Sequence, residues 1–274
     1  MVTASEEYSF KSFSSLPFYT KVNARLLDLA EVGKQRRIVD LGCGTGGVTK
    51  LILERLQSTK DSVIYAVDHS TSALKAATEE IGERKNVAIN YVHSEVQNLT
   101  DAVKERVDAI VYCNSIHYVP DKPNLLAQIK GKLSPNGIFA FNTSFFDGSH
   151  PPDSHEFFRK WMMRSLRILK REHGLSADKA AKVESRVQLT ADQYIEFVEN
   201  AGFRVEVNDL NRVEVPHEGY HHISGFSDWI EGVMPGVPLE TGREALQEGL
   251  GQIWDEMNLQ TIPRVWLSVS ASRA

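Results

Sequence analysis

The sequence predicts an α/β fold in which a largely parallel sheet is covered by helices on both faces. From residue 36 onward, short apolar runs alternate with helical segments at spacings that suit βαβ units. The apolar runs are nearly continuous, which is typical of strands buried on both faces. A glycine-rich turn follows the first of these strands directly and precedes a helix with turn-periodic apolar residues.

Seven strands are expected along the chain. Five of them precede residue 143, at residues 37–41, 63–67, 87–92, 107–112 and 138–142. Strand character returns at 203–210 and 264–270. Helices fill the intervals, the first of them over 47–56, and Thr190 is expected to cap a helix that follows it.

The composition is that of an ordinary globular protein. Of the 274 residues, 42% are apolar and 24% are charged, which excludes collagen-like, coiled-coil and wholly disordered chains. The length favours one large domain with a cap over two separate domains. With 31 basic and 36 acidic side chains the net charge is −5, so we expect no nucleic-acid partner.

The cysteine count and the lengths of the apolar runs indicate where in the cell the protein is expected. Cys43 and Cys113 are too few for a disulfide framework and suit a reducing cytoplasm. No apolar run approaches the roughly 18 residues of a membrane span, and the first residues do not resemble a secretion signal. We therefore expect a cytoplasmic protein without a membrane span.

The glycine-rich turn has the sequence VDLGCGTGG over residues 39–47. One interpretation is G-x-G-x-x-G, formed by Gly42, Gly44 and Gly47. Asp68 lies about 20 residues further on, so a dinucleotide-binding turn is formally possible. Such a turn places a diphosphate at a helix N-terminus, where its negative charge is favoured.

The second interpretation is D-x-G-x-G-x-G, which begins at Asp40 and ends at Gly46. An acid just before the turn would repel a diphosphate, so Asp40 argues against a nicotinamide dinucleotide. S-adenosylmethionine carries an ammonium, a sulfonium and a ribose but no phosphate. An acid at the edge of a glycine turn is useful for binding that molecule.

The turn, together with Asp68 and the later segments 92–96, 108–117 and 133–139, resembles the class I S-adenosylmethionine-dependent methyltransferases. The resemblance covers residues 36–143 and, more loosely, 189–271. It implies a Rossmann-like seven-stranded sheet with the last strand antiparallel, helices on both faces and a helical cap insertion. Cofactor and acceptor would meet at the carboxyl ends of the strands.

The resemblance also assigns cofactor contacts. Asp68 matches the acid that accepts both ribose hydroxyls, a strong charge-assisted contact. Glu95 matches the acid that takes the adenine amino group, and Val96 lies along the adenine. The expected cofactor-binding residues are Asp40, Gly42, Cys43, Gly44, Gly46, Asp68, His69, Glu95, Val96 and Cys113.

His117 is the leading candidate for a general base, because it lies on the loop expected to face the methyl group and an ordinary histidine titrates near pH 6.5. The alternative is a histidine that only holds the loop. Tyr19, in an aromatic N-terminal segment, is a second candidate, as a hydrogen-bond donor to the acceptor. Histidines elsewhere lack a recognised ligand spacing, so we expect no metal.

The loop after the fourth strand reads Cys113-Asn-Ser-Ile-His117 and lacks the Asn/Asp-Pro-Pro-Tyr/Phe pattern of enzymes that methylate base or amide nitrogens. Oxygen or carbon acceptors are therefore favoured. We expect the acceptor to contact His117, Phe145, His150 and Trp161. The apolar side of a helix over 156–171 would cover it, although such stripes are also how ordinary surface helices pack.

Four regions are expected. Residues 1–35 form an N-terminal helical segment over the active site, and residues 36–143 form the cofactor-binding core. Residues 144–188 form a helical cap insertion. Residues 189–274 complete the core sheet and add a further cap segment.

These patterns predict an S-adenosylmethionine-dependent methyltransferase that acts on an oxygen or carbon of a small, largely apolar metabolite. One alternative is an RNA- or protein-directed methyltransferase that docks through the basic helix. The other is a non-catalytic module that binds S-adenosylmethionine. The expected partner is a small-molecule acceptor, and the sequence does not indicate the oligomeric state.

Overall fold

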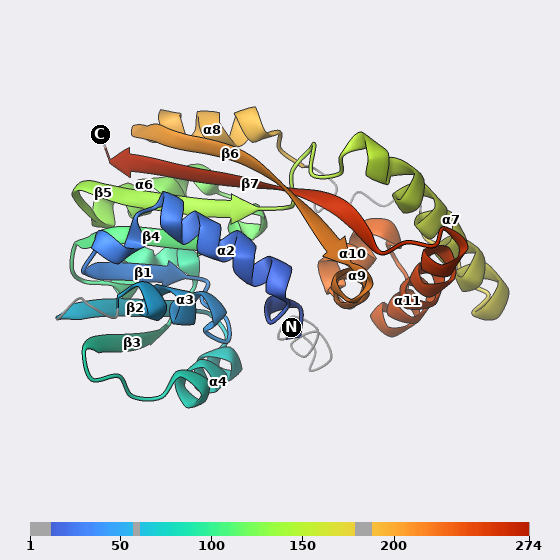
Figure 1. Ribbon diagram of the computed structural model, residues 1–274, viewed down its shortest axis with the longest axis horizontal. Helices are drawn as coiled ribbons and strands as arrows, with labels where there is room; N and C mark the ends of the chain where they lie inside the picture. Colours follow the sequence, from blue (N-terminus) through green and yellow to red (C-terminus); the bar gives the residue numbers. More distant parts are fainter. Residues whose placement is uncertain (1–11, 57–60, 179–187, 274) are drawn as a thin grey trace. The chain divides into compact units, whose positions relative to one another are not determined.

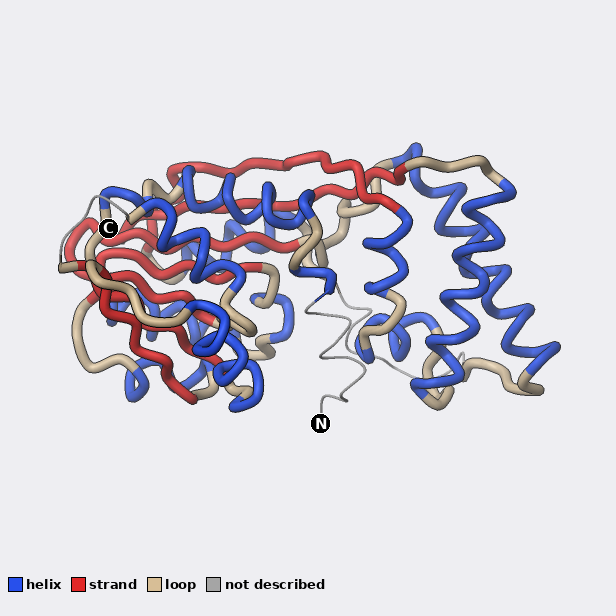
Figure 2. Tube along the Cα trace, turned by 60° about the horizontal axis from the view of Figure 1, so that its bottom comes forward, coloured by secondary structure: helices blue, strands red, loops and turns tan. Residues whose placement is uncertain are grey.

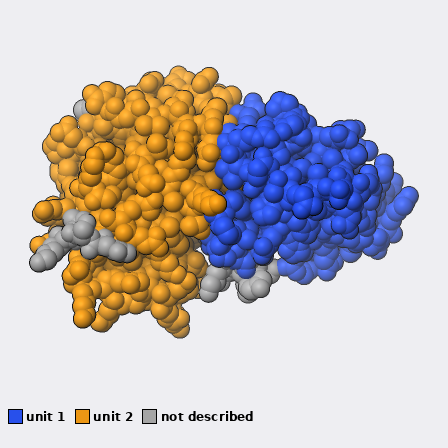
Figure 3. Space-filling view, in the orientation of Figure 1, with its two compact units in different colours: residues 1–19, 147–188, 212–265 blue, residues 20–146, 189–211, 266–274 orange. Residues whose placement is uncertain are grey.

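The computed structural model describes residues 12–56, 61–178 and 188–273. The chain divides into two compact units, coloured separately in Figure 3. Unit 1 comprises residues 1–19, 147–188 and 212–265. Unit 2 comprises residues 20–146, 189–211 and 266–274.

A seven-stranded sheet has the strand order β3-β2-β1-β4-β5-β7-β6 (Figure 1). The strands β1 to β7 comprise Arg37–Leu41, Ser62–Asp68, Val87–His93, Val107–Cys113, Leu133–Thr143, Phe203–Pro216 and Thr261–Arg273. The predicted fold class is confirmed. Residues 203–211 and 266–273 of the last two strands lie in unit 2, and both strands continue into unit 1.

The first five strands are parallel, so their carboxyl ends meet at one edge. Asp40 in β1 pairs with Ala66 in β2 and with Val111 in β4, while Asp68 in β2 pairs with His93 in β3. The loops that follow these strands therefore share the edge at which open α/β sheets bind ligands.

The last strand of the chain, β7, is antiparallel to β5, with Phe141 opposite Val269, as the resemblance implied. Strand β5 begins at Leu133, five residues before the predicted start. Pro135 has no backbone N–H to donate and Asn136 has a φ of 62°, so this stretch departs from regular pairing. The register with β4 shifts there, between Val107 and Ala109.

The helices of unit 2 cover the sheet. Helix α2 begins in unit 1 and continues into unit 2. The helices are α2 Pro17–Leu29, α3 Gly47–Arg55, α4 Thr71–Ile81, α5 Leu99–Ala102, α6 Lys122–Lys132 and α8 Ala191–Asn200, with short 3-10 turns at Val32–Lys34, Val96–Asn98 and Ile116–Tyr118. Figure 2 shows these helices in blue beside the red strands.

Alternation along β5 separates two apolar layers, because successive side chains of a strand point to opposite faces. Ala140 belongs to the cluster formed by α2, α3 and the central strands. Its neighbour Phe141 faces the other way and contacts Tyr194 of α8, with 5.9 Å between ring centroids. Thr190 caps α8 as predicted, and Gln193 completes a capping box.

Unit 1 is mainly helical. Its elements are a 3-10 turn at Pro152–Ser154, helices α7 His155–Glu172, α9 His217–Ile223, α10 Ser227–Val233 and α11 Leu239–Glu256, and the ends of β6 and β7. Helix α7, predicted over 156–171, packs against α11. Its buried side includes Phe157 and Trp161, whereas Phe158 and Met162 are only half-buried.

Among helices in the described ranges, none is long and apolar enough to cross a bilayer. Of the predicted N-terminal segment, residues 1–11 lie outside the described residues, as do 179–187 of the predicted cap.

Candidate functional site

The glycine turn uses the second of the two predicted spacings. Gly42, Gly44 and Gly46 all have positive φ, at 69°, 51° and 86°, a region that favours glycine. Gly47 is not among the residues with positive φ, and a Cβ placed on it would meet nothing within 4 Å. A Cβ on Gly46 would lie 2.8 Å from Cδ1 of Ile81. The backbone therefore needs glycine at the D-x-G-x-G-x-G positions.

The turn is tied to the end of β2. The N–H groups of Gly42 and Cys43 both donate to the carbonyl of Val67, at 2.8 and 3.0 Å. The N–H of Gly44 donates to Oδ2 of Asp68 at 2.7 Å. Three consecutive amides thus hold the loop after β1 against the neighbouring strand.

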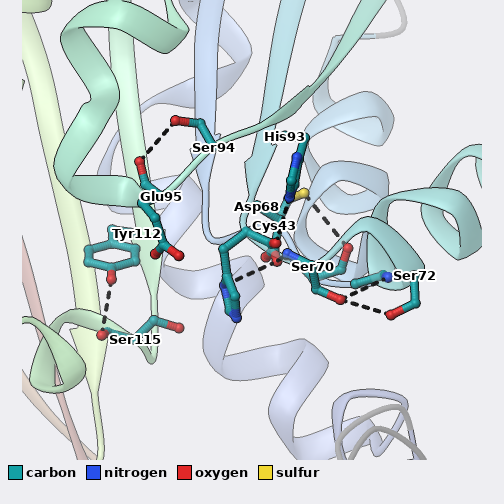
Figure 4. Close-up of polar contacts among 12 residues, drawn as sticks. Cys43, Asp68, Ser70, Ser72, His93, Ser94, Glu95, Tyr112 and Ser115 are labelled. Atoms are coloured by element: carbon teal, nitrogen blue, oxygen red, sulfur yellow. Dashed lines mark hydrogen bonds and ion pairs between the residues drawn. The ribbon is translucent and has the colours of Figure 1, made fainter. Parts of the chain in front are cut away.

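Asp68 closes two loops with one carboxylate (Figure 4). Oδ2 accepts the bond from Gly44, and Oδ1 accepts the N–H of Ser70 at 2.9 Å. Asp68 is buried, with 6% of the residue exposed. Nδ1 of His69 lies 3.5 Å from Oδ1, and the His69 side chain is 57% exposed. A carboxylate has about four acceptor positions, so Asp68 retains capacity for further donors.

Asp40 is buried at 1% exposure beneath the turn. The hydroxyl of Thr49, in the first turn of α3, donates to its Oδ2 at 2.6 Å. Among the described residues none donates to Oδ1. Burial raises the pKa of Asp40 to about 7; the Thr49 bond opposes this shift and the charge of Asp68 adds to it.

The third predicted acid lies at the end of β3. Glu95 is exposed, and Figure 4 shows its side chain beside the ring of Tyr112 on β4. Burial raises the pKa of Tyr112, and the charges of Asp68 and Glu95 raise it further. The Tyr112 hydroxyl donates to the carbonyl of Ser115 at 3.1 Å, which orders the loop after β4. Val96 follows Glu95 and is half-buried.

The loop after β4 is anchored to the end of β5. Asn114 has a φ of 50°, and its N–H donates to both the carbonyl and the side-chain oxygen of Asn142 at 2.9 Å. Nδ1 of His117 lies 3.1 Å from the hydroxyl of Thr143. The His117 ring stacks on Phe145, with 4.2 Å between centroids. Two predicted acceptor contacts, His117 and Phe145, are thereby brought together.

The two cysteines belong to this region and are reduced. Cys43 and Cys113 are both buried and free. Burial raises the pKa of each thiol, so both stay protonated near neutral pH. They are therefore small apolar groups here and not nucleophiles.

The remaining predicted site residues lie in unit 1. Tyr19 is buried against Phe13, with 4.9 Å between ring centroids. Trp161 is fully buried and its indole N–H donates to the carbonyl of Leu246 at 2.8 Å. The ring centroids of His150 and Phe158 lie 4.0 Å apart, and the two rings are tilted by 32°. All the predicted cofactor-binding residues, by contrast, lie in unit 2.

Residues 39–139 match the protein family described as a methyltransferase domain. Over these residues the chain carries a class I S-adenosylmethionine-dependent methyltransferase domain. The predicted family, enzyme class and methyl donor are confirmed.

Individual proteins resemble the chain over different lengths. A trans-aconitate 2-methyltransferase from Delftia acidovorans is 25% identical over 232 residues, which are 84% of this chain and 80% of that protein. A malonyl-[acyl-carrier protein] O-methyltransferase from Halalkalibacterium halodurans is 32% identical over 113 residues, 39% of either chain. A solved structure from Bacillus halodurans, with a provisional methyltransferase assignment, aligns at a TM-score of 0.55 and 14% identity. The alignment covers 92% of this chain and 99% of the Bacillus halodurans chain. At this identity the likeness supports the fold and not the activity.

The residues of this methyltransferase fit its methyl donor on structural grounds. Oδ1 of Asp40 has no hydrogen-bond partner among the described residues, and the ionised form of this acid would repel a phosphate. A second carboxylate, Asp68, holds the turn and keeps acceptor capacity for hydroxyl donors. These two acidic hydrogen-bond acceptors suit a cationic nucleoside better than a diphosphate.

Sequence reasoning overlooked several residues that position this methyltransferase's site. Thr49 holds Asp40, and it was detectable as a polar residue on the buried side of a predicted helix. Asn142 and Thr143, at the end of β5, hold the loop of His117. These two gave no signal, because the pairing of β5 with β4 is a tertiary feature.

The glycine turn leads to a matched pair of substitutions. Gly46→Ala places a methyl group against Ile81 in a left-handed backbone, so we expect it to lower the free energy of unfolding by about 1–3 kcal/mol. Gly47→Ala should leave stability and binding of S-adenosylhomocysteine near wild type. Denaturant unfolding and calorimetry measure both, and equal effects of the two variants would refute the assigned spacing.

The buried Asp40 leads to a pH dependence of stability. Its folded-state pKa, about 7, is above the unfolded value near 3.9, so the folded state binds the extra proton between these values. The unfolding free energy therefore falls as pH rises from about 4 to about 7, by up to about 1.4 kcal/mol per pH unit.

Asp40→Asn removes this proton and should flatten that slope in denaturant unfolding of the cofactor-free protein. The exposed Asp101→Asn is the control and should follow wild type. Parallel curves for wild type and Asp40→Asn would contradict the assignment.

Proposed function

We propose that this small-molecule methyltransferase transfers the methyl group to an oxygen or carbon of a small, largely apolar metabolite, and specifically to a carboxyl oxygen. The observation that carries the proposal is the convergence at one sheet edge of the glycine turn, Asp68 and the His117–Phe145 pair. The relatives support the oxygen: one is named for trans-aconitate, a carboxylic acid, and the other for O-methylation of a malonyl group.

The proposed cofactor contacts follow the edge of the sheet. Asp68 accepts the ribose hydroxyls, Glu95 accepts from the adenine amino group and Val96 packs along the adenine. The glycine turn and Asp40 hold the amino-acid end. When bound, S-adenosylmethionine supplies an electrophilic methyl carbon on a sulfonium. The chain mainly aligns the acceptor and excludes water, effects that together lower the barrier substantially.

The role proposed for His117 depends on the acceptor's proton. A hydroxyl acceptor must lose a proton, and the imidazole of His117 is placed by Thr143 and Phe145 to take it. A carboxylic acid is already ionised near neutral pH and needs no base. For a carboxyl acceptor, His117 then orients the acceptor. Tyr19 is proposed as a hydrogen-bond donor to it.

We propose that the four predicted regions of the chain have the following roles. Residues 36–143 bind the cofactor, and residues 189–274 complete the sheet and add a cap segment. Residues 1–35 and 144–188 enclose the acceptor, with contacts from His150 and Trp161. Two buried free thiols suit a reducing compartment, so we place the reaction in the cytoplasm.

The decisive experiment is methyl transfer from isotope-labelled S-adenosylmethionine to a panel of small acceptors. The panel pairs carboxylic acids with alcohols and amides of the same carbon skeleton. We expect labelled methyl esters to form from acids only. Methyl transfer to the alcohols or amides, with none to the acids, would refute the carboxyl proposal.

The ribose role of Asp68 is tested by substitution. Asp68→Ala removes a carboxylate that accepts charge-assisted bonds, so we expect S-adenosylhomocysteine binding to weaken by about 1.5–3 kcal/mol. Asp101→Ala, an exposed acid on α5, is the control. Because Asp68 also accepts from Gly44 and Ser70, thermal unfolding must show that the variant is folded at the assay temperature. Undiminished binding by folded Asp68→Ala would exclude the ribose role.

His117→Ala separates the two roles of that residue. If the acceptor is a carboxylate, the variant should lose rate by a similar factor across about pH 6–9, since no proton is abstracted. A loss confined to pH values at which imidazole is neutral identifies a base and a protonated acceptor. His173→Ala, an exposed histidine of unit 1, serves as the control for histidine loss. An unchanged rate at every pH would remove His117 from the mechanism.

A further inference from the structure

Helices α7 and α11 of unit 1 pack against each other and lie side by side in Figures 1 and 2. Nζ of Lys160 lies 3.7 Å from a carboxylate oxygen of Glu256. Further along α7, Ser165 is so close to Gly249 that a Cβ on the glycine would clash with the serine hydroxyl. Residue numbers therefore rise along α7 as they fall along α11, so the two helices are antiparallel.

A stripe of basic side chains runs along α7. Its members follow one another at intervals of four, three and four residues, a spacing that keeps them on one side of a helix. They are Lys160, Arg164, Arg167 and Arg171. Arg164 donates to Gln252 at 2.9 Å and to Glu256 at 2.5 Å. Arg167 and Arg171 are exposed and form no ion pair with the residues that the structure describes, so they are open to an acid from another molecule.

Helix α11 presents a stripe of acids beside the basic stripe. Glu244, Glu248 and Asp255 follow at intervals of four and seven residues, and all three are exposed. Gln252 connects the two stripes, because it accepts from Arg164 and donates to Glu248 at 2.8 Å. The two stripes therefore face the same way. Together they form a surface, which we call the α7–α11 surface, with positive charge along one side and negative charge along the other.

The antiparallel packing sets which charges are level with one another. From the contact at Gly249, each step forward along α7 matches a step back along α11. Arg167 is then level with Glu248, and Arg171 is level with Glu244. The members of each pair lie on different helices, whose axes are about 8–10 Å apart, and the pairs do not close within one copy.

We propose that the α7–α11 surface binds the same surface of a second copy of this chain. A two-fold axis parallel to the helices places α7 of each copy over α11 of the other. Arg167 then meets Glu248 of the second copy, and Arg171 meets Glu244 of the second copy. Met163, which is 46% exposed, is covered by the same contact. Each charged pair forms twice, once on either side of the axis.

The mixed charge of the surface favours a second copy over other partners. A wholly acidic protein, an RNA or an anionic membrane would attract the basic stripe but would be repelled by the acidic stripe next to it. A second copy presents both stripes in the order that complements the first copy. Opposite charges then face each other along both helices, and like charges do not.

The size of the surface predicts a weak dimer. Each helix has 18 residues and is about 27 Å long, so the pair presents on the order of 500 Å² per copy. A total of about 1,000 Å² is near the lower limit for a specific interface. Because the contact joins mainly exposed charges, we expect a micromolar dimer that salt weakens. This inference goes beyond the proposed function and does not depend on it.

The test is sedimentation velocity of the full chain and of two charge-reversal variants. Arg167→Glu/Arg171→Glu gives both helices acidic side chains at the contact, and Glu244→Arg/Glu248→Arg gives both helices basic ones. We expect wild type to dimerise at micromolar concentrations in low salt, and each variant alone to dimerise at least tenfold more weakly. An equimolar mixture of the two variants should form a heterodimer, because each reversed stripe then meets its complement.

Controls separate this contact from net charge and from folding. Lys75→Glu/Lys85→Glu changes the net charge by the same amount as the acidic variant at exposed positions of unit 2, and it should dimerise as wild type does. Circular dichroism shows whether each variant is folded. If a double variant fails to fold, the single variants Arg167→Glu and Glu248→Arg are compared and mixed in the same way.

The inference is overturned if wild type stays monomeric at about 100 μM in low salt, a concentration well above the micromolar dissociation constant expected for such an interface. Binding of that monomer to polyglutamate or to phosphatidylserine vesicles would assign the surface to an anionic partner instead. The inference also fails if either folded reversal variant dimerises like wild type, or if mixing the two variants restores no dimer. No methyl donor is used, so a failure of the proposed function leaves these results unaffected.

Discussion

The carboxylate of Asp68 is the contact on which the geometry of this edge of the sheet depends. It accepts an amide from the glycine turn after β1 and another from the start of α4 after β2. Together with the two amides on the carbonyl of Val67, it sets where the turn lies relative to the neighbouring strand. Without this carboxylate the turn would lose the bond that fixes its middle residue, Gly44. The same group is proposed to recognise the ribose, so structure and recognition share one side chain.

The two buried acids at this edge differ in what surrounds them. Asp68 receives two backbone amides, which compensate an ionised carboxylate. Asp40 accepts the hydroxyl of Thr49 at Oδ2, and its burial raises its pKa to about 7. Two neighbouring buried acids thus avoid carrying two full charges in the cofactor-free protein. A cationic ligand would change that balance.

The local sequence predicted much of the fold and less of the site. The strand over 37–41 was predicted at its observed bounds. The start of the apolar run marks its first residue, and the glycines that follow mark its end. The acids Asp40 and Asp68 were found because each ends or nearly ends a strand. The anchoring of the His117 loop by Asn142 and Thr143 was not, since the register between β4 and β5 is set by packing across many residues. The hydrogen bond from Val265 to Ser149 joins residues more than a hundred positions apart, which no periodicity reveals.

The distribution of tryptophan determines which unit of the molecule dominates its intrinsic fluorescence. Of the four indoles in the chain, Trp161, Trp229 and Trp254 belong to the aromatic interior of unit 1, and Trp266 begins the last segment of unit 2. Ultraviolet-excited emission therefore comes mostly from the helical unit, whereas the glycine turn and its acids have no indole of their own. Fluorescence would follow melting of the helical unit closely and would report little on events at the glycine turn.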